Sequence, residues 1–489
     1  MNMTRDTVVS SEEESAPSML DSVLSVLLLV VLLASSVYLF GTESSYGGNQ
    51  AALSIAAFVV SLIGLKNGIP WREIEASIIG GVSTSISAIL ILLLVGALVG
   101  SWVLSGTIPA LVYWGGSLLD PALFYMSACI LCAMISISVG SSWTTAATMG
   151  VGLIGVSLSL DLSPEVTAGA IISGAYFGDK MSPLSETTNM ASAVTGVDLF
   201  THIKHMMWTT VPSMLIAIVY FYVLGMSADV SMVDAKVKEN LSLIEEHFYI
   251  GFPVFLPIVV VLFLSIKGVP ALASIALGVL SGILTAVVFQ GSALQGMSTA
   301  SSDVYFMGYL ASIFHTMSNG YQVETGSELV NSLLNRGGMS SMLNTVWLIV
   351  VAMVYGAVLE RVGIMKVILK LIIDKSKSTG SLIFSTLLTC LGINLLTGDQ
   401  YMAITLSGRM YKLEFKKRHL KPESLSRTVE DSATITSPLI PWNTCGAYMS
   451  ATLGVVTLSY LPHCIFNILC PVMSCLFGYT GFKVSKESV

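Results

Sequence analysis

Charged residues are scarce in this chain. Lys, Arg, Asp and Glu make up 11% of its 489 residues, whereas hydrophobic residues make up 54%. A soluble domain carries about a quarter charged residues, so this composition excludes an ordinary soluble fold. Apolar stretches long enough to cross a bilayer recur along the chain. We therefore expect an all-α polytopic membrane protein with roughly 10 to 13 membrane segments, counting half-helices and re-entrant hairpins.

Motifs of enzymes and of metal centres are also missing. No GxSxG or HExxH motif pairs a nucleophile or a metal with a base. Cys129 and Cys132 form a CxxC inside an apolar run, with no second pair at zinc spacing. The 6 histidines show no i, i+4 pair. We expect neither an enzyme nor a bound cofactor.

Basic residues are concentrated in one place. Seven of the 23 Lys and Arg residues lie between Arg409 and Arg427, which predicts a cytoplasmic, solvated loop. We expect no nucleic-acid partner. The first 18 residues are acidic and provide no basic n-region, so we expect no signal peptide.

The chain carries the same features twice. Ser182-Pro183-Leu184 recurs 255 residues later as Ser437-Pro438-Leu439. Three glycine pairs keep nearly the same offset: Gly80-Gly81 with Gly337-Gly338, Gly96-Ala97 with Gly356-Ala357, and Gly140 with Gly398. In each half we expect the Gly-Gly pair to be a turn that opens a long helix. A duplicated apolar chain with matching Pro and Gly interruptions indicates a secondary transporter.

This duplication gives the expected organisation. It comprises a disordered tail (1–18), a leading transmembrane helix (19–48), a first repeat (49–225), a polar connector with a short amphipathic helix (226–248), a second repeat (249–480) and a tail (481–489).

Polar residues surround the Ser-Pro-Leu and glycine interruptions. Proline breaks or kinks a helix, and the freed carbonyls need partners inside protein or beside water. Such carbonyls, with hydroxyl and carboxylate oxygens, replace the hydration shell of Na⁺. The candidate Na⁺ ligands are Ser141, Ser142, Asp179, Ser182, Ser185, Glu186, Thr187, Thr188, Asn189, Asp399, Ser437, Asn443 and Thr444.

Acidic residues inside a membrane are costly, at about 2.5–3.5 kcal/mol each, and are usually functional. A carboxylate that holds either H⁺ or Na⁺ is the minimal device for exchange. The candidates for proton coupling are Asp179, Glu186, Asp399, Asp431 and Glu360.

Each candidate also has a structural alternative. Glu360 beside Arg361 also fits a helix end at the headgroups, and Asp431 also fits the basic loop. Asp179 beside Lys180 also fits a local ion pair. A Ser-Pro pair can be a packing kink, and the two tryptophans at these points, Trp143 and Trp442, fit either interfacial anchors or a cavity wall.

The quoted stretches resemble the NhaC family of Na⁺/H⁺ antiporters, within the ion-transporter superfamily. The likeness lies in Gly140-Ser141-Ser142-Trp143, in Gly178-Asp179-Lys180-Met181-Ser182-Pro183-Leu184-Ser185 with Thr187-Thr188-Asn189, in Gly398-Asp399-Gln400-Tyr401, and in Ser437-Pro438-Leu439-Ile440-Pro441-Trp442-Asn443-Thr444. It covers nearly the whole chain. Two positions differ: the family commonly has Gly where this chain has Thr144, and Asp where it has Glu186.

The resemblance implies inverted repeats, two re-entrant hairpins, broken helices and a dimeric, elevator-like transporter in a bacterial inner membrane. It also implies the cargo, Na⁺ exchanged for H⁺. Some members of the family exchange malate and lactate with Na⁺ and H⁺, so a small carboxylate is the alternative cargo.

Overall fold

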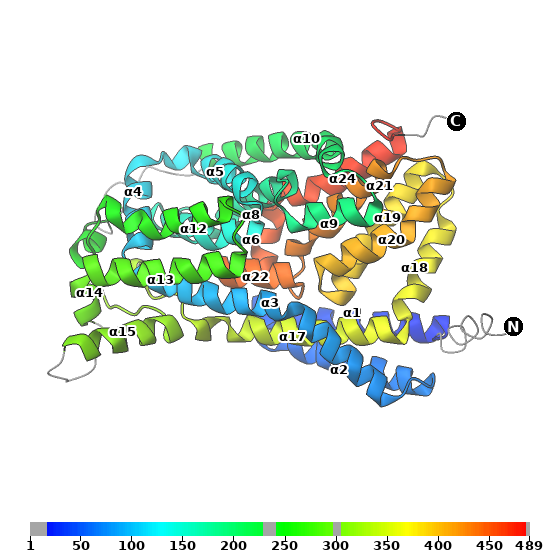
Figure 1. The fold of residues 1–489 in the computed structure, drawn as a ribbon, viewed down its shortest axis with the longest axis horizontal. Helices are drawn as coiled ribbons and strands as arrows, with labels where there is room; N and C mark the ends of the chain where they lie inside the picture. The colour runs from blue at the N-terminus through cyan, green and yellow to red at the C-terminus, as the bar shows by residue number, and fades with distance from the viewer. Residues whose placement is uncertain (1–16, 228–240, 297–304, 486–489) are drawn as a thin grey trace, which may run out of the picture.

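The protein is entirely helical over the residues that the structure describes. These are residues 17–227, 241–296 and 305–485 of a computed structural model, and they contain no β-strand (Figure 1). The helices before the connector are α1 (Met19–Phe40), α2 (Gly48–Lys66), α3 (Trp71–Leu104), α4 (Thr107–Leu118), α5 (Phe124–Val139), α6 (Ser142–Thr145), α7 (Val151–Ser159), α8 (Pro164–Met181), α9 (Glu186–Thr195) and α10 (Leu199–Met226).

The helices after the connector are likewise a mixture of long and short helices. They are α12 (Leu256–Ile266), α13 (Ala271–Phe289), α14 (Gly291–Gly296), α15 (Tyr305–Asn319), α16 (Glu328–Leu334), α17 (Leu343–Val362), α18 (Ile364–Lys375), α19 (Thr379–Thr397), α20 (Gln400–Lys417), α21 (Pro422–Thr436), α22 (Thr444–Leu453), α23 (Thr457–Tyr460) and α24 (Ile465–Thr480). The expected disordered tail lies almost wholly outside the described residues, as does most of the connector.

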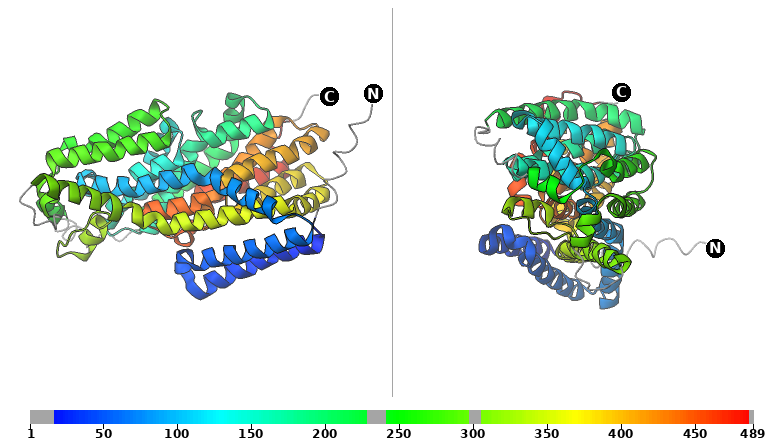
Figure 2. Two further views of the ribbon diagram at one scale, coloured as in Figure 1. Left: turned by 60° about the horizontal axis from the view of Figure 1, so that its bottom comes forward. Right: turned by 90° about the vertical axis from the view of Figure 1, so that its left-hand side faces the viewer.

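Several of these helices are built to cross a bilayer. Among the described residues, eight helices are long and apolar enough, and two bent helix pairs would bring the number to ten. The outermost helix, α1, pairs with α2 along one edge of the molecule (Figure 2). Its apolar side chains, such as Leu20 and Leu27, stay exposed, as lipid contact requires. The expected polytopic all-α fold is confirmed.

Helix α3 makes two close contacts with α17 and with the loop that precedes it. The Gly338 amide donates to the Gly96 carbonyl at 2.7 Å, and a Cβ at Gly96 would lie 2.4 Å from the Gly338 oxygen. At the other end of the crossing, a Cβ at Gly81 would lie 2.5 Å from that of Ala357. The prediction that Gly80-Gly81 forms a turn is therefore wrong, because α3 runs through both glycines and Gly81 provides space for a neighbouring helix.

Both Ser-Pro-Leu sequences interrupt helices. Ser182 leaves α8 in an extended conformation and α9 begins only at Glu186; we call Ser182–Ser185 break 1. Similarly, α21 ends at Thr436 and α22 begins at Thr444; residues 437–443 are break 2. Neither interruption is a mere kink, because each separates two helices.

Glycine turns face both breaks. Gly140 (φ +75°) ends α5 and begins turn 1, residues 140–144, while Gly398 (φ +68°) ends α19 and begins turn 2, residues 398–401. A Cβ at Gly140 would lie 2.6 Å from that of Leu184 in break 1. In the second half, the Thr444 amide donates to the Gly398 carbonyl at 2.8 Å. Each turn therefore packs against the break of its own half.

The basic cluster between Arg409 and Arg427 is not an extended loop. Its first part lies on α20, which ends at Lys417, and only residues 418–421 separate that helix from α21. Arg427 is fully buried on α21. The prediction of a solvated loop is wrong for Arg427, because the chain re-enters the protein interior at Pro422.

Candidate functional site

Both turns, break 1 and the helix that follows break 2 meet at one cavity of about 430 Å³. Turn 1, the end of α8 and the start of α9 line it from the first half, and turn 2 with the start of α22 lines it from the second. Of the candidate Na⁺ ligands, the cavity wall includes Ser141, Ser142, Asp179, Glu186, Thr187, Asp399 and Thr444. The two halves of the sequence thus converge on one place.

Asp179 ties the end of α8 to turn 1. Its Oδ2 accepts hydrogen bonds from the Ser142 hydroxyl at 2.7 Å and from the Ser142 amide at 3.2 Å. The residue is only 7% exposed. Hydrogen bonds to an ionised carboxylate are the stronger kind, so Ser142 stabilises Asp179 in its charged form. The carboxylate lines the cavity, where it can hold a cation.

Glu186 and Asp399 bring acidic groups from the two halves. The Tyr401 hydroxyl of turn 2 donates to Glu186 Oε2 at 2.9 Å, across the junction between the halves. Asp399 caps α20, where its Oδ1 accepts from the Met402 amide at 2.8 Å. Glu186 begins α9. Because helix N-termini favour negative charge, both carboxylates lie where their charge is stabilised.

The other candidate ligands do not line the cavity, and their side chains are engaged in hydrogen bonds within the protein or are buried. Ser185 and Asn443 cap α9 and α22, and Asn189 donates to the Pro183 and Ser185 carbonyls. Thr188 donates to the Lys180 carbonyl at 3.2 Å. Ser437 donates to the cavity residue Gln400 at 3.2 Å, and Ser182 is fully buried. These residues fix the breaks in place.

Two of the acidic candidates also lie away from the cavity. Asp431 is fully buried on α21 and forms an ion pair with Lys180, which is fully buried as well. The Thr209 hydroxyl donates to the same Asp431 oxygen at 3.0 Å. Asp431 therefore belongs to neither a loop nor a surface, and Lys180 pairs across the halves rather than with Asp179. Glu360 is exposed in the last turn of α17.

Sequence reasoning missed one wall of the cavity. Thr84, Ser85 and Ser87 of α3 line it, together with residues 268–271 between α12 and α13. The run Ser83-Thr84-Ser85-Ile86-Ser87 is unusually polar for a membrane helix, and this signal could have identified the wall. Figure 1 shows α3 and α13 side by side beneath α6 and α22.

The two tryptophans at these points have different surroundings. Trp143 lines the cavity and stacks on Tyr448 at 3.9 Å between ring centroids. Trp442 donates to the Leu395 carbonyl at 2.7 Å and does not line the cavity. Only Trp143 fits the prediction of a cavity wall.

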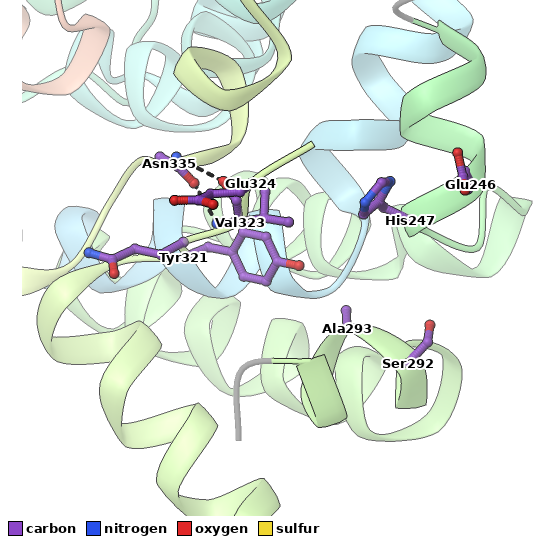
Figure 3. A pocket seen from close by; sticks show the side chains of 9 residues that line it. Glu246, His247, Ser292, Ala293, Tyr321, Val323, Glu324 and Asn335 are labelled. Atoms are coloured by element: carbon purple, nitrogen blue, oxygen red, sulfur yellow. Dashed lines mark hydrogen bonds between the residues drawn. The ribbon is translucent and has the colours of Figure 1, made fainter. Parts of the chain in front are cut away.

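The described residues hold no group of three or more His, Cys, Asp or Glu side chains arranged to bind a metal. A cation in the cavity would therefore be held by separate carboxylates together with hydroxyl and carbonyl oxygens, the donors of hard monovalent ions. A larger cavity of about 640 Å³ lies elsewhere, between the helical segment Leu241–His247 and the chain around Tyr321 (Figure 3). Its acids, Glu246 and Glu324, are exposed, and it contains none of the candidate ligands.

A helical membrane protein whose broken helices enclose an acidic cavity is a multi-pass transporter. The model of the Na⁺/H⁺ antiporter family matches residues 174–482, and this chain belongs to that family. It is 36% identical over 460 residues to the Na(+)/H(+) antiporter NhaC of Alkalihalophilus pseudofirmus, covering 94% of this chain and 95% of that protein. The resemblance carried by the motifs is confirmed, and the chain is a transporter, not an enzyme.

Two relatives from Bacillus subtilis are similarly close. The Na(+)/H(+) antiporter NhaC is 35% identical, covering 93% of this chain and 96% of that protein. The Malate-2H(+)/Na(+)-lactate antiporter is 34% identical, covering 88% and 89%. Relatives with similar sequence identity to this chain therefore have names that state different cargo.

Proposed function

We propose that this protein exchanges Na⁺ for H⁺ across the membrane and that the cavity is the site of exchange. The observation that carries the proposal is the charge of the cavity wall. Asp179, Glu186 and Asp399 line it, and none of the lining residues is Lys, Arg or His. A membrane cavity with three acids and no base attracts a cation.

The geometry supports competition between the two cations at Asp179. Na⁺ there exchanges its water shell for the Asp179 carboxylate and the neighbouring Ser142 and Thr444 oxygens. A proton on the same carboxylate removes the charge that holds Na⁺. The site then holds either Na⁺ or H⁺ but not both. When the cavity opens alternately to the two sides of the membrane, Na⁺ is exchanged for H⁺. In this proposal Glu186 and Asp399 also bind Na⁺ and H⁺ in competition.

The direct test uses the purified protein in liposomes that enclose a pH-sensitive dye. An outward Na⁺ gradient should drive proton uptake into the lumen, and the same gradient of choline should not. A protein that moves Na⁺ without protons, or neither ion, would contradict the proposal.

A carboxylate co-substrate is the second candidate function. The cavity volume of about 430 Å³ equals that of roughly a dozen waters at about 30 Å³ each, which exceeds the need of one ion. The N-termini of α9, α20 and α22 also face it and favour anions. The malate and lactate named for one relative are therefore worth testing: if proton movement in the same liposomes requires malate or lactate, this second function replaces the first.

We also propose that the halves are inverted repeats. The α3–α17 crossing supports this, because its contacts are reciprocal. In the repeat, Gly81 corresponds to Gly338 and Gly96 corresponds to Gly356. Gly96 contacts Gly338, and Gly81 contacts Ala357, which directly follows Gly356. A two-fold axis through the crossing would generate this pattern. In an elevator-like mechanism, α3 and α13 would form the fixed wall and the turns and breaks the moving one.

The location and assembly in this proposal are a bacterial inner membrane and a homodimer. The apolar outer face of α1 and α2 supports a bilayer setting. The family resemblance supports the dimer. Mass measurement of the protein in lipid nanodiscs checks the assembly, and a monomer that transports would refute it.

A further inference from the structure

Glu430 is a buried acid that the exchange at the cavity does not use. It lies on α21 and is 0% exposed. Among the described residues no hydrogen bond of normal geometry reaches either of its carboxylate oxygens, although the Thr187 and Thr434 hydroxyls lie nearby. A buried carboxylate without partners is costly, so its presence calls for a ligand.

The surroundings of Glu430 connect it with the cavity. The Thr187 hydroxyl faces it, and Thr187 also lines the cavity wall. Lys180 and Asp179 are the charged residues that act on Glu430. Glu430 therefore lies one layer behind the cavity, separated from it by a single hydroxyl side chain.

The Lys180 ammonium does not neutralise Glu430. It forms its ion pair with Asp431, the next residue along α21. Arg427, the other buried base on this helix, donates to the Lys483 carbonyl at 3.0 Å and lies against the Phe477 ring. Across α8 and α21 the buried charged residues are three acids and two bases, namely Asp179, Glu430, Asp431, Lys180 and Arg427. One monovalent cation makes this set neutral.

Among the described residues, the other helices packed against α21 place no further buried charge beside Glu430, because charged residues such as Glu186 on α9 and Arg409 on α20 are exposed. The nearby titratable groups that they present are His202 on α10, Cys390 on α19 and Cys470 on α24. His202 binds the Ser426 hydroxyl through Nδ1 at 2.8 Å, and its Nε2 has no partner among the described residues.

We infer that Glu430 is an inner binding site for one proton, which exchanges with the cavity past Thr187. This inference rests on the proposed cation exchange at the cavity. Since Asp179 and Glu430 share one missing positive charge, a Na⁺ ion arriving at Asp179 releases the proton held at Glu430. The inner site thus couples the two ions without both occupying one carboxylate.

The test compares Glu430→Gln with Glu423→Gln, the same substitution in the first turn of α21, where the side chain is only half-buried. Calorimetry gives the number and affinity of bound Na⁺ ions, and a pH dye in weakly buffered detergent gives the protons released as Na⁺ binds. In E430Q the remaining four buried charges already cancel, so Na⁺ affinity should fall, and proton release per bound Na⁺ should fall by about one proton. Loss of one bound Na⁺ per chain with unchanged proton release would show that Glu430 holds Na⁺ and would overturn the inference. E423Q should match the wild type in both.

An E430Q variant that binds Na⁺ and releases protons as the wild type does would overturn the inference. In that case normal Na⁺-driven proton flux in wild-type liposomes would leave the proposed function intact, whereas absence of that flux in the wild type would overturn both. Should E430Q fail to fold, Glu430→Asp retains the charge and moves it back toward α21. A changed pH dependence of Na⁺ binding in E430D supports the inner site, and an unchanged one refutes it.

Discussion

Asp179 is the residue at which the two structural features of the cavity meet. It lies near the end of α8, just before break 1, and its carboxylate accepts two hydrogen bonds from Ser142 in turn 1. A single carboxylate thereby joins a broken helix to a glycine turn and presents its charge to the cavity. Replacing that charge should affect the cargo more than the fold.

Asp179→Asn should lower Na⁺-driven proton flux by about 10- to 100-fold. The estimate takes the loss of one charged interaction as about 1.5–3 kcal/mol. The side chain keeps its shape, so the protein should still purify as a folded species. Flux is measured in dye-loaded liposomes at limiting Na⁺.

Asp161→Asn is the matched control for Asp179→Asn. Asp161 is exposed and has a positive φ of 53°, a conformation that Asn accepts well. It should transport normally. If both variants transport alike, Asp179 does not bind the cargo.

The pair of Lys180 and Asp431 couples α8 to α21 at the element scale. The two side chains are 0% exposed and 251 residues apart in sequence. Breaking a buried pair leaves one charge uncompensated, which costs about 3–5 kcal/mol, whereas replacing both partners by apolar groups is often neutral.

Lys180→Met alone should therefore lower stability by about 3–5 kcal/mol, and the double variant Lys180→Met with Asp431→Leu should recover most of this loss. The measurement is the thermal unfolding midpoint in detergent. A double variant no more stable than the single one would show that Asp431 has another essential partner, with Thr209 the first to examine.

The α3–α17 crossing offers an internal comparison between two glycines of one helix. A Cβ at Gly96 would meet the Gly338 backbone at 2.4 Å, whereas one at Gly80 would meet nothing within 4 Å. Gly96→Ala should cost about 1–3 kcal/mol by forcing α3 away from the loop before α17. Gly80→Ala should be neutral or slightly stabilising, because Ala favours helix over Gly by up to about 1 kcal/mol. Unfolding midpoints of both variants check this, and equal effects would contradict the close crossing.

The same elements show which features the sequence could predict. Both breaks could be placed from the repeated Ser-Pro-Leu sequence, because proline kinks or breaks a helix. Proline alone does not decide between the two outcomes, since α10 and α24 continue through Pro212 and Pro471. A glycine inside an apolar run is ambiguous, because it serves either a turn or a close contact. The distinction depends on a distant neighbour such as Ala357, and Gly80-Gly81 was accordingly misassigned.

Partners far along the chain limited the prediction of the site in the same way. Asp179, Glu186 and Asp399 could be nominated because acids are rare in a membrane. That Lys180 would pair with Asp431, or that the hydroxyls of α3 would form the opposite wall, depends on how the two halves pack. Nothing local to these residues encodes that packing.

At the scale of the whole molecule, the cavity is a joint product of the two halves. Asp179 and Glu186 come from the first, Asp399 from the second, and the Glu186–Tyr401 hydrogen bond links them directly. A cation bound there contacts both halves at once. Its binding energy should therefore stabilise the folded protein as a unit, and not only one segment.

Na⁺ should consequently raise the unfolding midpoint of the protein. A ligand at 100 times its Kd adds about 2.7 kcal/mol of stability. Choline chloride at equal ionic strength is the control, because choline is too large to replace its hydration with the oxygens of this cavity and only screens surface charge. Equal stabilisation by choline would mean that the effect is one of ionic strength and that the cavity does not bind Na⁺.

The pH dependence of this stabilisation tests the exchange itself. At acid pH, protons occupy the cavity carboxylates before Na⁺ arrives, so Na⁺ must displace them and its net contribution shrinks. At alkaline pH the carboxylates are free and the Na⁺ contribution reaches its full value. The shift in unfolding midpoint at a fixed Na⁺ concentration should accordingly grow as pH rises and then level off. A shift that is the same at both ends of the pH range would show that Na⁺ and H⁺ do not compete, which is the relation on which antiport at this cavity depends.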